Sequence, residues 1–139
     1  MKTYNCILLV DDDPISNFIN HETLRKNKIC KEILISRNGE EALSLLHEYQ
    51  FKHHSLPEVI LVDIRMPIMD GFEFLQAFEK ISIPGKEKTK VIILSNIFSR
   101  SDIEVLKKIG HSYYLNKPLE KNKLFDLLDI EKERTSGMN

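Results

Sequence analysis

The chain has 139 residues, 42% of them apolar and 29% charged, so it fits one globular domain and is not wholly disordered. Lys and Arg number 20 and Asp and Glu 21, a balance that argues against a protein that coats nucleic acid or binds acidic membranes. The first apolar run, residues 6–10, is too short for a signal peptide or a membrane span. We therefore expect a cytoplasmic protein in which Cys6 and Cys30 stay reduced.

Short apolar runs alternate with longer helical patterns along the chain. The clearest runs cover residues 6–10, 59–62 and 91–94, and weaker ones cover residues 32–35 and 113–115. Because these runs are continuously apolar rather than alternating, they predict strands that are buried on both faces, as in a parallel sheet.

Helical periodicity fills the segments between and after these runs. Pro14 marks the start of a less regular helix that extends to Lys28, and Gly110 is a helix stop. Residues 83–90 are expected to form an exposed, charged loop. Apolar spacings of three and four predict four further helices. Their stripes are Ala42, Leu45, Leu46 and Tyr49; Phe74, Leu75, Phe78 and Ile81; Ile103, Leu106 and Ile109; and Leu124, Leu127 and Leu128.

The resulting order is a strand followed by a helix, repeated five times. Strands joined by helices run parallel with right-handed crossovers, which predicts an α/β fold with a five-stranded sheet and helices on both faces. We expect one domain over residues 1–139, with its core at about residues 5–130 and a polar tail at residues 131–139. In such sheets ligands bind at the carboxyl ends of the strands.

Polar residues stand directly after four of the predicted strands. Two carboxylates about 4 Å apart repel each other by roughly 4 kcal/mol at an effective dielectric constant near 20, so a cluster of three must protonate or bind a cation. Oxygen ligands select a hard ion, Mg²⁺ or Mn²⁺, and a metal beside a carboxylate, a lysine and a hydroxyl suits phosphoryl transfer. A carboxylate can itself be the nucleophile. The residues concerned are Asp11, Asp12, Asp13, Asp63, Ser95, Asn96 and Lys117.

Other kinds of site fit the sequence less well. Aspartates that only cap helices would explain one acidic turn, but not polar residues after four strands. The sequence contains no glycine-rich dinucleotide motif and no P-loop. An EF-hand loop would require other residues where Ile15 and Ser16 stand. A haloacid-dehalogenase phosphatase would require an acid in place of Arg65, and a flavodoxin would bind its phosphate where three aspartates repel it.

Two segments resemble a known family. Residues 9–14 (LVDDDP) and 63–71 (DIRMPIMDG), followed by Ser95 and the pair Lys117-Pro118, resemble the receiver domain of two-component response regulators. The resemblance covers roughly residues 5–130 and implies the flavodoxin-like strand order 2-1-3-4-5.

The resemblance implies a role for each residue of the motifs. Asp63 would accept a phosphoryl group from a phosphohistidine on a histidine kinase or a histidine phosphotransfer protein. Asp11 and Asp12 would hold Mg²⁺ (or Mn²⁺) together with Asp63 and the backbone carbonyl of Arg65, with Asp12 the more direct ligand. Lys117 would pair with the phosphoryl oxygens.

The resemblance also implies a switch. Ser95 matches the hydroxyl that swings to the phosphate, and Tyr114, three residues before Lys117, matches the aromatic side chain that turns inward. Tyr113 is the alternative for that aromatic role. Pro118 is expected to follow a cis peptide bond.

The sequence departs from the family pattern at a few positions. Asn96 replaces the usual small residue after the switch hydroxyl, and Arg65 lies two residues after the acceptor. Both are expected to modulate dephosphorylation, in a direction that the sequence does not assign. His111 replaces the usual alanine after Gly110, and Gly71 is interpreted as a turn residue that needs permissive backbone angles.

The implied function is that of a signalling switch rather than an enzyme. Phosphorylation would shift the equilibrium between an inactive and an active conformation. The surface that changes would be formed by the fourth helix, fifth strand and fifth helix. Its apolar residues Ile97, Phe98 and Tyr114 would contact an unidentified downstream protein. We expect a stand-alone receiver that binds neither nucleic acid nor membrane; a fragment of a hybrid kinase is an alternative. Two other functions stay open: a degenerate receiver that binds protein without phosphorylation, and a small Mg²⁺-dependent phosphatase that uses Asp63.

Overall fold

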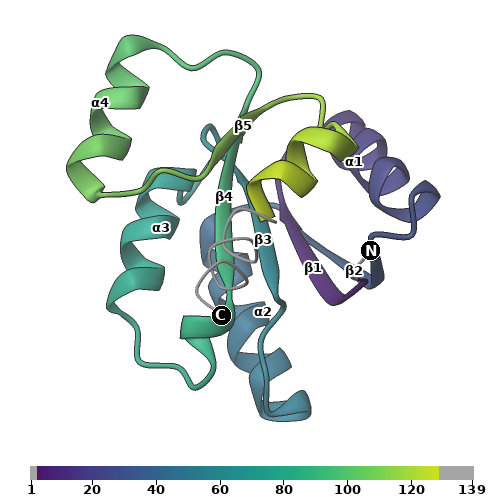
Figure 1. Ribbon diagram of the computed structural model, residues 1–139. Helices are drawn as coiled ribbons and strands as arrows, with labels where there is room; N and C mark the ends of the chain where they lie inside the picture. The colour runs from purple at the N-terminus through teal and green to yellow at the C-terminus, as the bar shows by residue number, and fades with distance from the viewer. Residues whose placement is uncertain (1–2, 129–139) are drawn as a thin grey trace, which may run out of the picture.

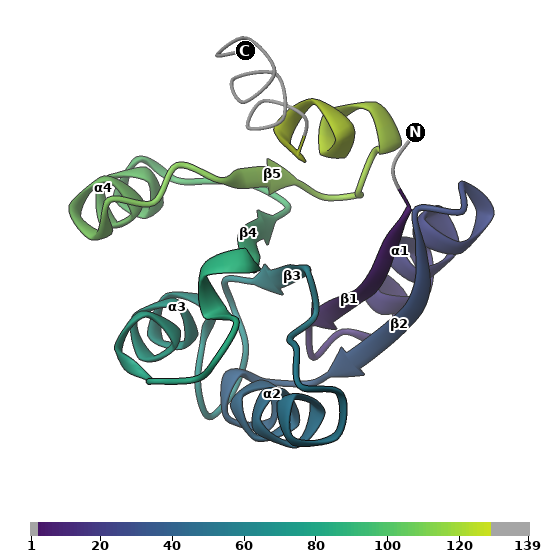
Figure 2. The ribbon, with the colours of Figure 1, turned by 60° about the horizontal axis from the view of Figure 1, so that its bottom comes forward.

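Five parallel strands form one sheet in a computed structural model that describes residues 3–128. Their order is β2-β1-β3-β4-β5, which confirms the expected α/β fold and strand order. Figures 1 and 2 show helices on both faces of this twisted sheet. The strands are β1 (Tyr4–Val10), β2 (Cys30–Ser36), β3 (Val59–Asp63), β4 (Lys90–Ser95) and β5 (Tyr114–Asn116).

Each predicted helix is present in the described part of the chain. In Figure 2, α2 and α3 lie on one side of the sheet, and α1 and the helix over residues 121–128 lie on the other. The labelled helices are α1 (Pro14–Lys26), α2 (Gly39–His53), α3 (Gly71–Lys80) and α4 (Arg100–Ile109), with a short 3₁₀ helix, η1 (Lys86–Lys88), before β4.

Some expected boundaries differ from the observed ones. Helix α1 ends at Lys26 instead of Lys28, because Lys28 has a left-handed backbone with a φ of 52°. The segment 83–90 is not simply an exposed loop, since it contains η1 and its first residue, Ile83, is buried in the core. The expected polar tail, residues 131–139, lies outside the described residues.

The central strands are buried on both faces, which explains their continuous apolar sequences. Successive strand residues point to opposite sides of the sheet, so alternate residues of one strand enter different cores. The core on the α2–α3 side includes Leu8, Val10, Ile60, Val62, Leu46 and Phe74. The core on the α1 side includes Ile7, Leu9, Leu61, Ile92, Leu24 and Leu124.

The register of the strands brings distant polar residues to one edge of the sheet. Val10 pairs with both Ser36 and Val62, so the residues after them, including Asp11 and Asp63, lie at the same level. Asp63 in turn pairs with Leu94 of β4. The next pair, Ser95 with Asn116, continues this level to β5 and Lys117.

Helix caps fix where the helices start beyond this edge. The Asp13 carboxylate accepts the Ile15 amide at the start of α1, where Pro14 occupies the first turn. Capping boxes start α3, between Asp70 and Glu73, and α4, between Ser99 and Asp102. Such caps satisfy amides that a helix leaves without partners.

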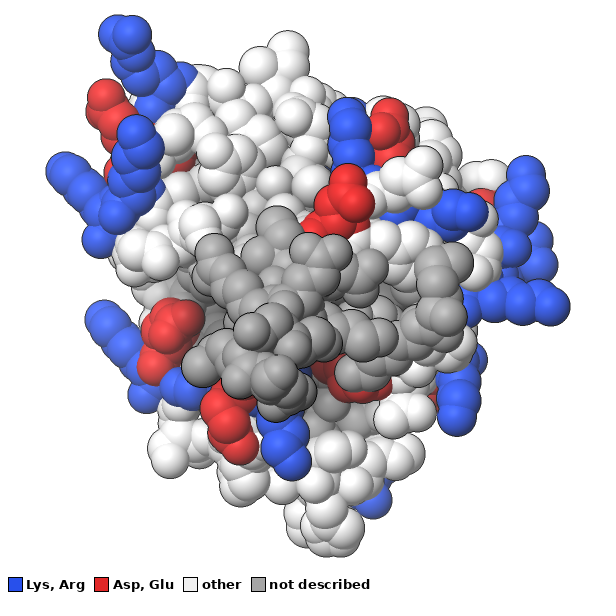
Figure 3. All heavy atoms as spheres, viewed as in Figure 1, with Lys and Arg blue, Asp and Glu red and all other residues white. Residues whose placement is uncertain are grey.

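The surface carries both charge signs. On the face in Figure 3, acidic and basic side chains lie next to one another around the rim. No helix in the described residues is long and apolar enough to cross a membrane.

Candidate functional site

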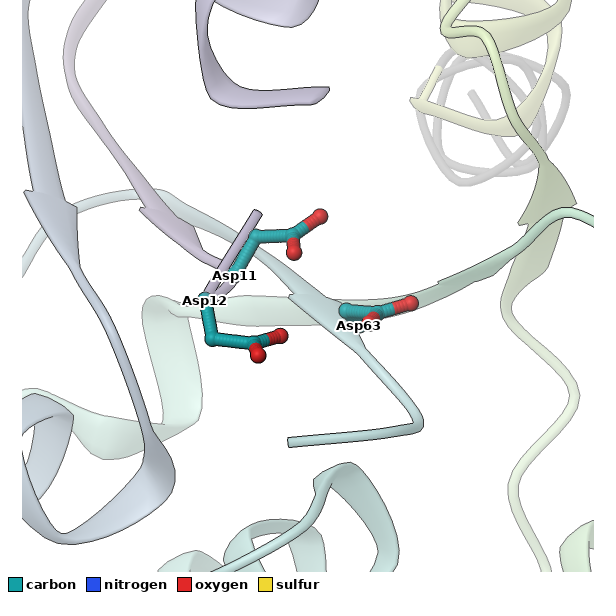
Figure 4. A group of neighbouring side chains, drawn as sticks. All are labelled: Asp11, Asp12 and Asp63. Atoms are coloured by element: carbon teal, nitrogen blue, oxygen red, sulfur yellow. The ribbon is translucent and has the colours of Figure 1, made fainter. Parts of the chain in front are cut away.

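Three carboxylates converge at the carboxyl ends of β1 and β3. One oxygen from each of Asp11, Asp12 and Asp63 lies within 4.8 Å of the others (Figure 4). Asp11 and Asp63 are buried, with 3% and 9% of their surface exposed, whereas Asp12 is exposed. The cluster therefore combines two desolvated acids with one that is open to solvent.

Lys117 joins the two buried acids. Its Nζ lies 2.6 Å from Asp11 Oδ2 and 3.1 Å from Asp63 Oδ1, and its side chain is only 7% exposed. The Lys117 amide donates to the Ser95 carbonyl at 2.8 Å, and the Lys117-Pro118 bond is cis, as expected. We call Asp11, Asp12, Asp63 and Lys117 the acid pocket.

Burial and neighbouring charges set the protonation of the acid pocket. Burial raises the pKa of Asp63, and the nearby Asp11 and Asp12 charges add to this effect against the opposing influence of Lys117. Burial alone would lower the pKa of Lys117, but its hydrogen bond to Asp11 and the charges of Asp11 and Asp63 raise it overall. Lys117 therefore stays charged, and Asp63 is the acid whose charged form is disfavoured by burial and by repulsion from its neighbours.

Two asparagines of helix α1, which the sequence pattern did not identify as site residues, fix the backbone around the acid pocket. Asn17 Nδ2 donates to the Asp11 carbonyl at 2.9 Å. Asn20 Oδ1 accepts the Leu119 amide at 3.1 Å, which ties α1 to the segment after Lys117. Both asparagines are buried. Their signal in the sequence is the irregular apolar pattern of this helix, since polar residues three apart occupy its inner face.

Gly71 has a different role from the one expected. Positive φ angles among the described glycines occur at Gly85 and Gly110, so Gly71 does not need the left-handed region. Instead, a Cβ at position 71 would lie 2.4 Å from the Asp63 carbonyl oxygen and 2.9 Å from Ile64 Cα. Gly71 is required because α3 begins directly against the backbone that carries Asp63.

The segment beside the acid pocket combines a buried serine with exposed apolar side chains. Ser95 Oγ donates to the Ile97 carbonyl at 2.9 Å, so the hydroxyl bonds within its own loop. The rings of Phe98 and Tyr114 lie 5.0 Å apart, and Tyr114 is 37% exposed. Ile97 is 79% exposed. We call residues 95–98 together with Tyr114 the response segment.

The two candidate aromatic residues lie on different sides of β5. Tyr114 contacts Phe98 beside α4, whereas Tyr113 packs against the core on the α1 side and lies under the Lys90 ammonium, which is 4.4 Å from the ring centroid. Asn96, the departure from the family pattern, is exposed, and its carbonyl accepts from Asn116 Nδ2 at 3.3 Å.

Arg65 forms a contact that the sequence reasoning did not foresee. Its Nη2 donates to both carboxylate oxygens of Asp102 at 3.2 Å, across 37 positions of sequence. The Ser99 amide and hydroxyl hydrogen bond to Asp102; despite burial, these bonds and the Arg65 charge lower the pKa of its carboxyl. The loop that carries Asp63 is thereby tied to α4.

The donors present fit a hard divalent cation. All three clustered side chains offer oxygen, and Mg²⁺ is usually held by one or two carboxylates with waters and phosphate oxygens completing its shell. The exposed Asp12 leaves access from solvent. An acidic triad of this kind is typical of the Mg²⁺ site of receiver domains.

A parallel α/β sheet that presents such a triad and a lysine at its carboxyl edge defines a class of phosphoryl-accepting switch domains. Residues 7–129 match the family described as response regulator receiver domain. The chain belongs to this family. It is a signalling domain of two-component phosphoacceptor systems with its acidic pocket at Asp11, Asp12 and Asp63, and it is not a conventional enzyme.

Individual relatives agree with this assignment. The response regulator Rcp1 of Synechocystis is 26% identical and the match covers 88% of this chain and 82% of that protein. The probable C4-dicarboxylate response regulator DctR of Bacillus subtilis is 27% identical, but the chain spans only about half, 52%, of its length. The crystal structure of a two-component response regulator from Cytophaga hutchinsonii is 31% identical with a TM-score of 0.81, covering 92% of this chain and 96% of that one.

Proposed function

We propose that Asp63 is the phosphoacceptor of this receiver. The observation that carries the proposal is its position: a buried carboxylate within 4.8 Å of two other acids and 3.1 Å from a buried lysine. Repulsion from Asp11 and Asp12 favours any change that neutralises or disperses the charge of Asp63 or adds a cation. A bound divalent ion offsets this repulsion, and phosphorylation converts the Asp63 carboxylate into a mixed anhydride whose added charge lies on the phosphoryl oxygens, within reach of the ion and of Lys117.

The phosphoryl donor in this proposal is a phosphohistidine. A two-component receiver implies a cognate histidine kinase; we extend the donor to that kinase or a histidine phosphotransfer protein. An Asp63 oxygen attacks phosphorus, the N–P bond of the phosphohistidine breaks, and its electron pair returns to the imidazole. The reaction needs no nucleophile beyond the carboxylate itself.

Mg²⁺, with Mn²⁺ as an alternative, is the proposed cofactor. Asp12, Asp11, Asp63 and the backbone carbonyl of Arg65 are the groups that would hold it. When bound, the ion neutralises charge on the transferred phosphoryl oxygens. Asp12 is the more direct ligand in this proposal because it is the exposed member of the three acids.

Lys117 orients the acceptor before transfer and binds the product after it. Its ammonium already contacts Asp63 Oδ1, and after phosphorylation the same group pairs with a phosphoryl oxygen while keeping its 2.6 Å contact with Asp11. Charge-assisted hydrogen bonds of this kind are about twice as strong as neutral ones. The lysine therefore favours the phosphorylated state without leaving its place.

Ser95 and Tyr114 carry the switch in our proposal. Ser95 exchanges its bond to the Ile97 carbonyl for one to the phosphoryl group, and the response segment moves with it. Tyr114 then turns inward from its half-exposed position beside Phe98, which alters the face of α4 and β5. A shift from 1:99 to 99:1 needs roughly 5.5 kcal/mol, which a few charge-assisted bonds of about 1.5–3 kcal/mol each can supply. A downstream protein reads this face.

We further propose that residues 1–139 act as one receiver, with its core at about residues 5–130. The cytoplasm is the proposed compartment. The presence of all three acids and Lys117 favours the phosphoacceptor over a degenerate receiver that binds protein without phosphorylation.

Intact mass spectrometry tests this function. The protein is incubated with acetyl phosphate and Mg²⁺, and one phosphoryl unit should be gained. The gain should disappear when the metal is chelated and in Asp63→Asn. A wild-type protein that gains no mass under these conditions, or from a phosphorylated histidine phosphotransfer protein, would reject the proposal in favour of the degenerate receiver.

A further inference from the structure

The ion pair between Arg65 and Asp102 links the acceptor loop to α4. Arg65 follows Asp63 by two residues, and Asp102 lies in the first turn of α4. Both Asp102 oxygens lie 3.2 Å from Arg65 Nη2. The two partners differ in burial, since the arginine side chain is 70% exposed and the aspartate side chain is 6% exposed.

Asp102 has hydrogen-bond partners besides this arginine. Its Oδ2 also accepts the Ser99 amide at 3.0 Å, and its own amide donates to Ser99 Oγ at 3.0 Å. If Arg65 leaves, the carboxylate keeps the capping box that starts α4. Departure of the arginine therefore removes its bonds to both carboxylate oxygens but leaves Oδ2 with the Ser99 amide, which lessens the cost of leaving a buried aspartate without its cation.

The Arg65 guanidinium can reach the space that a phosphoryl group on the Asp63 carboxylate would occupy. The Cα atoms of residues two apart are separated by at most about 7 Å, a span that an arginine side chain covers. A phosphoryl group on Asp63 would bring dianionic charge to that space, next to an exposed cation. Guanidinium groups match phosphoryl oxygens with two parallel hydrogen bonds, a geometry that lysine does not offer.

We propose that Arg65 binds the phosphoryl group once Asp63 is phosphorylated, and that it is paired with Asp102 until then. In the unphosphorylated protein it ties the acceptor loop to α4; on phosphorylation it exchanges Asp102 for the phosphoryl oxygens and releases the first turn of α4. This inference rests on the proposed function of Asp63. It adds a second connection between the acceptor and the α4 face, independent of Ser95.

Competition between two anions for one arginine makes an unusual prediction: substitutions of the two partners act in opposite directions. An ion pair with an exposed cation changes an equilibrium by only about two- to fivefold. Asp102→Asn keeps an oxygen for the Ser99 cap but frees Arg65, so affinity for a phosphoryl mimic should rise about two- to fivefold. Arg65→Gln removes the ligand itself, so affinity should fall about tenfold.

The experiment measures the equilibrium binding of beryllofluoride, a tetrahedral phosphoryl mimic, in the presence of Mg²⁺. The wild type, Arg65→Gln, Asp102→Asn and the double variant form a cycle. In the double variant Asp102→Asn should have no effect, because no arginine remains to be released. Lys52→Gln, which breaks the exposed pair with Glu48 on α2, is the matched control and should leave binding unchanged.

Hydrogen exchange of residues 100–103 gives a readout that affinity alone does not. Beryllofluoride should speed exchange there in the wild type, and Arg65→Gln should show the faster exchange without it. Effects of the same sign in both single variants, or the same Asp102→Asn effect with and without Arg65, would overturn the inference while leaving Asp63 as acceptor. If the wild type binds no beryllofluoride and gains no phosphoryl mass, the proposed function fails instead.

Discussion

The acid pocket has a buried centre, formed by two of its three acids and Lys117, whereas the response segment a few residues away carries exposed apolar side chains. Lys117 bridges Asp11 and Asp63, and the Asp11 carbonyl is held by Asn17. In the response segment, the Ser95 hydroxyl makes one bond, to the carbonyl of Ile97 in its own loop, and the Ile97 side chain is 79% exposed. The acid pocket, where phosphoryl transfer needs fixed geometry, and the response segment, which has to move, thus lie at separate places along one edge of the sheet.

The two neighbouring helices show the same contrast. Helix α3, which begins against Asp63, buries Phe74, Leu75 and Phe78, whereas the buried residues of α4 are Leu106 and Asp102. Elements with little buried apolar surface open and shift at low free-energy cost. The side of the molecule that carries the acceptor is therefore expected to stay fixed while α4 responds.

Removing the lysine should produce the largest effect, because it leaves two buried acids without their cation. Lys117→Met is expected to lower the free energy of unfolding by about 3 kcal/mol in metal-free buffer. Chemical denaturation measures this change. Lys123→Met, which breaks the exposed pair with Glu120, is the control and should change stability by less than about 0.5 kcal/mol. Equal small effects would contradict a tightly coupled acid pocket.

Adding a side chain at Gly71, where α3 lies against the Asp63 backbone, should have the next largest effect. Gly71→Ala is expected to cost about 2 kcal/mol, since its Cβ meets the Asp63 carbonyl and backbone atoms cannot yield as a flexible side chain would. Gly110→Ala tests the other kind of glycine, with a φ of 83° and open space around it, and should cost about 1 kcal/mol. Thermal or chemical unfolding compares them. A Gly71→Ala protein as stable as Gly110→Ala would remove the close-approach argument.

Neutralising the acceptor should stabilise the metal-free protein. The pKa of Asp63 is raised in the folded state by burial and by Asp11, so its charged form opposes folding; stability is lost as pH rises from the ordinary carboxyl range through the raised pKa. Asp63→Asn should therefore add on the order of 1 kcal/mol at pH 7 and little at acidic pH. Unfolding at both pH values in chelator tests this, with the exposed Asp126→Asn as control. Destabilisation at pH 7 would mean that the Lys117 contact outweighs the repulsion.

The smallest effect is expected in the response segment. Ser95→Ala loses one hydrogen bond, to the Ile97 carbonyl, and should cost about 0.5 kcal/mol in the unphosphorylated protein. Ser99→Ala removes the cap of α4 and should cost about 1 kcal/mol. If Ser95→Ala proves the more destabilising of the two, the response segment is more firmly held than its contacts indicate.

The sequence predicts the sheet and the place of the site because both follow from local pattern. Continuous apolar runs indicate strands buried on two faces, and parallel strands bring their carboxyl ends to one edge, so Asp11, Asp63 and Lys117 had to lie near one another. The Lys117-Pro118 cis bond followed from the family resemblance.

What the sequence does not reveal depends on tertiary contacts. The pairing of Arg65 with Asp102 joins positions 37 apart, and neither residue type nor spacing indicates it. Gly71 was interpreted as a turn glycine because local sequence cannot show that another backbone passes within van der Waals distance. Asn17 and Asn20 appeared only as an irregular helix pattern, since their partners lie on other elements.

Mapping the modified residue tests the central claim most directly. The protein is phosphorylated with acetyl phosphate and Mg²⁺, reduced with borohydride, which converts an aspartyl phosphate to homoserine, and digested for peptide mass analysis. Homoserine is expected at position 63, with Asp11 and Asp12 unmodified. Homoserine at position 11 or 12, or a phosphorylated protein that yields no homoserine, would contradict it.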